Sequence, residues 1–123
     1  MQLGNLPLRL MNAYFSMPRQ EGLDFLEEFR IPQIILRKYP SPEDRADAFD
    51  GAFTGFHVHL HLQEGGDKED WLEEIGDWYE NFGHKPGGPF HFGLAETLRC
   101  CNMLNFYHEA IHYIKRRAKI GAA

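Results

Sequence analysis

The sequence predicts a small α+β protein with about four helices, a short sheet of two or three strands and a long C-terminal helix. Three observations carry this prediction. Apolar and polar residues alternate toward the end of segment 53–62, whereas apolar residues recur at helical spacing between Trp71 and Phe82. Glycine and proline separate the two kinds of segment. The length of 123 residues fits a single globular domain, residues 1–123.

The first two helices are short and have recognisable ends. Leu23, Leu26 and Phe29 form an apolar stripe in segment 19–30. A second helix starts at Ser41, where the hydroxyl is a good N-cap and the following proline loses no hydrogen bond. We expect the sequence Asp50-Gly51 to stop this second helix.

The two later helices are longer. Asp67 is the expected N-cap of a helix whose apolar face runs from Trp71 to Phe82, and Gly83 suits the position just after its end. A glycine- and proline-rich loop follows at residues 84–89. The last helix is expected over residues 94–119. The basic residues near its end are favourable there, because the C-terminal end of a helix dipole is negative.

Three segments are expected to be strands. Residues 34–39 begin with β-branched side chains, residues 53–62 carry the clearest alternation, and residues 90–92 are a short third candidate.

The predicted strand 53–62 carries three histidines, His57, His59 and His61, separated by single apolar residues. On a strand, alternate side chains point to the same face, so the three imidazoles would share one face. Neighbouring members would lie roughly 7 Å apart and the outer pair roughly 13 Å apart, so at most two can bind one ion. A polar packing face and a partner-binding face are the alternatives.

A second histidine motif, His108-Glu109-Ala110-Ile111-His112, matches H-E-x-x-H inside the predicted last helix. Residues four apart on a helix project from the same side, so both imidazoles could bind one Zn²⁺ while Glu109 polarises a bound water. These five residues resemble the zinc-binding helix of the zincin metallopeptidases. The alternative is an amphipathic helix with two solvated histidines.

The resemblance implies that His108 and His112 are metal ligands and that Glu109 is the general base. Most zincins place the third ligand downstream, but residues 113–123 contain no histidine, aspartate or glutamate. The third ligand is therefore expected from the histidines at 57, 59 or 61.

The leading functional hypothesis is a small metal-binding protein that acts as a Zn²⁺-dependent hydrolase, with three histidine ligands and Glu109 as base. A second version binds Fe²⁺ at the same ligands and performs an oxidative reaction.

The competing hypothesis is a non-enzymatic accessory subunit, inhibitor or assembly factor. Such a protein would bind a protein partner or form a homo-oligomer. The aromatic content of 14% motivates it, because tryptophan and tyrosine are common interface anchors.

The net charge of −5 argues against general nucleic-acid binding. No apolar run is long enough to span a membrane, and the first ten residues lack the pattern of a secretory signal. Cys100 and Cys101 are adjacent and are expected to be reduced thiols, which favours a cytoplasmic protein.

Overall fold

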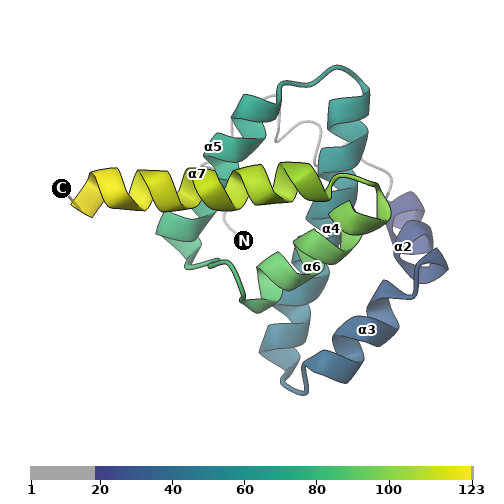
Figure 1. The fold of residues 1–123 in the computed structure, drawn as a ribbon. Helices are drawn as coiled ribbons and strands as arrows, with labels where there is room; N and C mark the ends of the chain where they lie inside the picture. Colours follow the sequence, from purple (N-terminus) through teal and green to yellow (C-terminus); the bar gives the residue numbers. More distant parts are fainter. Residues whose placement is uncertain (1–18, 123) are drawn as a thin grey trace.

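The computed structural model describes residues 19–122, and this part of the chain forms six helices (Figure 1). They are α2 (Arg19–Glu28), α3 (Ile31–Lys38), α4 (Pro42–Gln63), α5 (Lys68–Phe82), α6 (Pro89–Cys100) and α7 (Leu104–Ala122). Residues 19–122 contain no strand, so the predicted α+β class and its sheet are wrong. The first ten residues, which were expected to carry no secretory signal, lie outside the residues that the structure describes.

The helix that begins at Ser41 is much longer than predicted. Ser41 is its N-cap as expected, and its hydroxyl accepts a hydrogen bond from the Asp44 amide. Gly51 does not stop the helix, which continues through the predicted strand 53–62 to Gln63. The reason is that α4 is buried along much of its length, so tertiary packing outweighs the low helix propensity of its glycines.

The predicted strand 34–39 is also wrong, because residues 31–38 form α3. Pro32 occupies the first turn, where its missing N–H costs no hydrogen bond. Ile31 and Ile35 are completely buried and lie one turn apart on the same side of the helix. The β-branched residues therefore anchor a short helix rather than a strand.

Helix α5 confirms its prediction at both ends. Asp67 is the N-cap and accepts a hydrogen bond from the Glu69 amide. Gly83 follows the last turn with φ 70°, a left-handed conformation that glycine adopts without steric cost.

The predicted last helix is two helices. Residues 90–92, predicted as a strand, lie in the first turns of α6, which starts with Pro89. Asn102 has φ 58° and interrupts the helix, and the Met103 amide donates to the Leu98 carbonyl oxygen at 2.8 Å. The chain then turns sharply into α7, which crosses in front of α4 and α5 in Figure 1.

Helices α4 and α6 make the closest helix pairing of the described residues. Small side chains line the crossing, and several positions leave no room for a larger one. A Cβ at Gly51 would overlap the carbonyl oxygen of Phe90, and a Cβ at Gly93 would overlap that of Ala48. Gly55 lies against Thr97 further along the same pair. The two backbones therefore lie so close together that only glycine fits at these positions.

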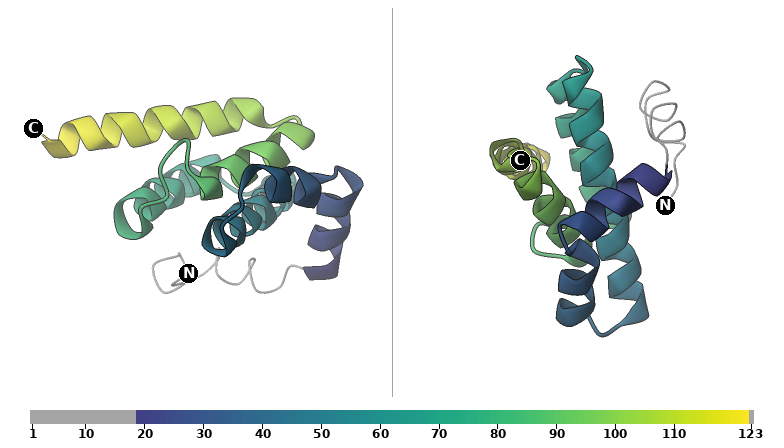
Figure 2. Two further views of the ribbon diagram at one scale, coloured as in Figure 1. Left: turned by 90° about the horizontal axis from the view of Figure 1, so that it is seen from below. Right: turned by 90° about the vertical axis from the view of Figure 1, so that its right-hand side faces the viewer.

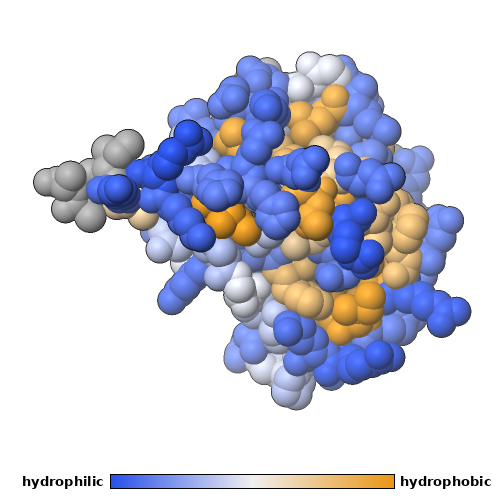
Figure 3. All heavy atoms as spheres, viewed as in Figure 1, coloured by the Kyte–Doolittle hydropathy of each residue, from blue (hydrophilic) through white to orange (hydrophobic). Residues whose placement is uncertain are grey.

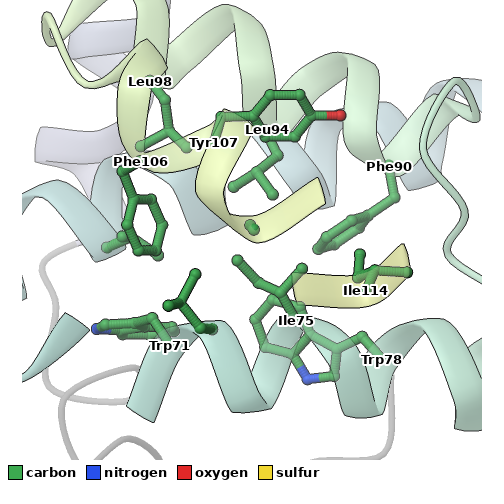
Figure 4. Packing of buried hydrophobic residues seen from close by; sticks show 12 residues of the cluster. Trp71, Ile75, Trp78, Phe90, Leu94, Leu98, Phe106, Tyr107 and Ile114 are labelled. Atoms are coloured by element: carbon green, nitrogen blue, oxygen red, sulfur yellow. The ribbon is translucent and has the colours of Figure 1, made fainter. Parts of the chain in front are cut away.

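Two hydrophobic clusters flank α4. The larger one joins side chains of α5, α6 and α7 to Val58 of α4. Figure 4 shows α5 side chains such as Trp71, Ile75 and Trp78 facing residues of α6 and α7. The smaller cluster lies against α2 and α3 and consists of Leu26, Ile31, Ile35, Ala48 and Ala52. Figure 2 shows α2 and α3 on the far side of the bundle from the C-terminal half of α7.

We expect Gly93→Ala to lower the free energy of unfolding by about 2 kcal/mol or more, because the added methyl group must push α4 and α6 apart. Urea denaturation followed by circular dichroism measures this loss. Gly76→Ala is the control, since its Cβ would meet side-chain atoms of Arg117 and Tyr113 rather than the backbone of a facing helix. Equal stability of the two variants would contradict the close crossing of α4 and α6.

Candidate functional site

The H-E-x-x-H motif lies within α7, as predicted, and its three polar side chains are exposed to solvent. The opposite side of α7 is buried through Phe106, Tyr107, Ala110 and Ile114. Helical periodicity therefore turns His108, Glu109 and His112 away from the core. The motif lies on an open surface rather than in a buried site.

Glu109 has a partner on the neighbouring helix. The Lys68 ammonium lies 3.3 Å from Oε1 and 3.1 Å from Oε2 of this carboxylate. Both side chains are about half exposed, at 53% and 48%, so the ion pair contributes little to stability. The general-base role of Glu109 stays a prediction.

A groove of about 390 Å³ between α5 and α7 brings part of the motif together with other charged residues. Glu109 and His112 line it, but His108 does not. The remaining lining residues are Glu69, Leu72 and Arg116. The groove therefore combines both signs of charge on a short stretch of surface.

The histidines at 57, 59 and 61 lie on a helix, which changes how they are arranged. Residues two apart on a helix point about 200° apart, whereas residues four apart share a side. His57 and His61 therefore share one side of α4, and His59 lies on another. The predicted common face of all three imidazoles is wrong.

His57 and His61 both contact Trp71 of α5. The Trp71 indole N–H donates to Nδ1 of His61 at 2.7 Å. The ring of His57 meets the indole edge-on at 5.7 Å between centroids. His57 is almost fully buried, and this burial, with a smaller contribution from the charge of His61, lowers its pKa to about 4. The rings of both histidines therefore pack edge-on against one indole.

His59 has a different neighbour. Its Nδ1 lies 3.3 Å from the sulfur of Met103, in the connection between α6 and α7. Burial lowers the pKa of His59. Within residues 19–122, no three or more His, Cys, Asp or Glu side chains form a group that could hold a metal ion. The expected meeting of the two histidine motifs in a three-ligand site is thus not seen in this range, and metal binding stays a prediction.

The structure also contains a buried histidine that the sequence analysis did not select. His91 of α6 is fully buried, and its Nδ1 lies 3.0 Å from the Tyr107 hydroxyl. Burial lowers the pKa of His91 to about 4 and raises that of Tyr107 to about 12. The signal in the sequence is its spacing, because His91, Leu94 and Leu98 share one side of α6.

A buried carboxyl group was missed as well. Glu74 of α5 is 3% exposed. Its pKa is raised to about 7, first by burial and then by the negative charges of Asp77 and Glu73, against the opposing effect of Arg117. Arg117 itself is held by Asp77 and by Glu80, whose Oε1 lies 2.8 Å from Nε. Glu74 therefore remains mostly protonated below neutral pH.

A second groove, of about 370 Å³, lies between α2, α3 and α4. We call it the α2–α3 groove. Its apolar lining comes from Leu23, Leu26, Pro32 and Phe49. Its polar lining comes from Gln20, Asp24 and Glu27 of α2.

The large hydrophobic residues that are exposed within residues 19–122 all belong to the α2–α3 segment. They are Leu23 at 37%, Phe29 at 40% and Leu36 at 45% exposure. Leu23 lines the groove, and Leu36 lies one turn after Pro32 on the same side of α3. Phe29, just after the end of α2, packs instead on Phe25, with 4.7 Å between the ring centroids, and does not line the groove.

Comparisons with family models, curated proteins and solved structures found no match to this chain. Among residues 19–122, none of the helices combines the length and apolar character needed to cross a membrane.

We expect Glu74→Gln to stabilise the protein at alkaline pH. Because the folded-state pKa of Glu74 is raised, its contribution to stability is complete below about pH 4.5 and is lost as pH rises through about 7. The neutral amide avoids this loss, so the free energy of unfolding should rise by about 1–3 kcal/mol at pH 8.5 and change little at pH 4.5. Thermal unfolding at both pH values measures the difference.

The control for this prediction is Glu73→Gln, which removes a neighbouring carboxylate that is exposed. It should change stability by much less at either pH. A Glu74→Gln effect of the same size at pH 4.5 and pH 8.5 would contradict ionisation as its cause.

Proposed function

We propose that this protein is a helical binding module that docks a protein partner through the α2–α3 groove. The observation that carries this proposal is a largely apolar groove lined by the exposed Leu23, with the exposed Leu36 one turn after the lining residue Pro32. Burying such side chains against a partner is favourable, by about 25 cal/mol for each Å² of apolar surface. This function is the non-enzymatic, partner-binding role that the sequence offered as the competing hypothesis.

The distribution of surface hydropathy supports this choice of face. Figure 3 shows mostly hydrophilic residues along α7, and hydrophobic residues both beside α7 and over α6 toward α3. The exposed residues of α7 include the three polar members of the H-E-x-x-H motif, His108, Glu109 and His112. A partner that buries apolar surface therefore gains more at the α2–α3 groove than on α7.

Selection from a displayed random peptide library on the immobilised full chain tests this proposal. Enriched peptides should bind the wild-type chain and lose at least about tenfold in affinity for the Leu23→Ser/Leu36→Ser variant, because it loses one apolar residue of the groove lining and one exposed leucine beside it. Phe29→Ser is the matched control, since it removes an equally exposed hydrophobic side chain outside the groove. Equal loss in both variants, or none in either, would contradict docking at this groove.

A zinc-dependent hydrolase, or its Fe²⁺ version, is the second candidate. The observation in its favour is that Glu109 and His112 line one groove between α5 and α7. An imidazole and a carboxylate on one surface can share a metal-bound water, with the carboxylate as base. His108 would be a further ligand in this candidate, as would one of His57, His59 and His61.

Elemental mass spectrometry of the untagged protein tests the second candidate. If it is correct, about one Zn²⁺ or Fe²⁺ per chain should be present and should be lost in His108→Ala/His112→Ala without loss of helical content. Because both side chains are exposed, the double variant should fold normally. Absence of metal after reconstitution with Zn²⁺ or Fe²⁺ would remove this candidate.

A further inference from the structure

The lining of the α2–α3 groove carries charge of one sign. Asp24 and Glu27 contribute carboxylates, and the described lining residues include no lysine or arginine. Gln20 donates a hydrogen bond to Oδ1 of Asp24 at 2.8 Å, which orients this carboxylate along the exposed side of α2. Four positions separate Gln20 from Asp24, and three separate Asp24 from Glu27, so the three side chains form one row on the helix.

This row borders an apolar floor. Leu26 is 1% exposed at the base of the groove, and Leu23 lies on the same helix as the two carboxylates. A purely apolar occupant would bury the floor but would also remove water from Asp24 and Glu27. An occupant with lysine or arginine beside its apolar residues replaces that water with ionic hydrogen bonds.

The secondary structure around the groove determines which kind of segment fits. Helices α2, α3 and α4 form its walls, so every lining residue lies on a helix and none on a strand. These walls offer no unpaired strand edge for an extended peptide. An amphipathic helix, by contrast, places apolar residues three and four positions apart along a groove.

We propose that the partner segment bound by the α2–α3 groove is a cationic amphipathic helix, whose apolar side contacts Leu23 and Phe49 and whose lysines or arginines pair with Asp24 and Glu27. This inference rests on the proposed function and specifies the chemistry of the partner.

Two synthetic amphipathic peptides with identical leucine positions provide the test, one with lysine and the other with glutamate at its polar positions. Each is titrated into the ¹⁵N-labelled full chain at low and high salt. The lysine peptide should shift amide signals of α2 and α3 and bind at least about tenfold more tightly than the glutamate peptide. High salt should reduce this preference.

Asp24→Asn/Glu27→Gln should remove the charge preference while the protein stays folded, because both residues are exposed. Glu43→Gln/Glu64→Gln is the matched control, since it removes two exposed carboxylates, one in the first turn of α4 and one just after its end, that do not line the groove. The control should bind the lysine peptide like the wild-type chain. Equal weakening by the two double variants would overturn the assigned role of Asp24 and Glu27.

The remaining outcomes separate this inference from the proposed function. If both peptides bind equally and Leu23→Ser/Leu36→Ser abolishes both, docking stands and the cationic partner is overturned. If neither peptide shifts signals of α2 or α3, the inference is overturned, and library selection decides the proposed function independently. Self-association that Leu23→Ser/Leu36→Ser abolishes, measured by sedimentation, would make a second copy the occupant and would also overturn it.

Discussion

The close crossing of α4 and α6 is the constraint on which the rest of the structure depends. At Gly51 and Gly93 the two helices approach so closely that a methyl group would overlap a backbone carbonyl of the facing helix. This approach places α4 at the centre of the molecule, with the larger hydrophobic cluster on one side and the smaller one on the other. The positions of α5 and α7 follow from the larger cluster, and those of α2 and α3 from the smaller one.

The central position of α4 also explains which parts of the fold could be predicted. The ends of α5 depend on local chemistry, and Asp67 and Gly83 identify them from sequence alone. The identity of α4 depends on tertiary contacts. A helix buried on two sides has no single apolar stripe, so the alternation around Val58 resembled a strand and Gly51 resembled a stop signal. Neither residue carries local information about the helix that packs against it.

The same error affected the candidate site. Local sequence correctly predicted that His108 and His112 share one side of a helix, because this depends only on the helical repeat. The arrangement of the other histidines changed with the secondary structure of α4, which brought His57 and His61 against Trp71 and left His59 beside Met103. Spacing within one element is predictable, but convergence of two elements depends on packing, which the sequence pattern does not encode.

The crossing of α4 and α6 also shapes the surface that α4 presents to α2 and α3. The carbonyl oxygen of Ala48 lies where a Cβ of Gly93 would be, and Ala48 and Ala52 are the small residues that α4 buries in the smaller cluster. Larger α4 side chains lie beside them, because Phe49 packs against this cluster and the Phe56 ring centroid lies 4.8 Å from that of Phe25. Leu26, Ile31 and Ile35 are buried in this contact. Leu23 of α2 and Leu36 of α3 lie outside the cluster and are exposed, which leaves apolar surface on this side of the molecule.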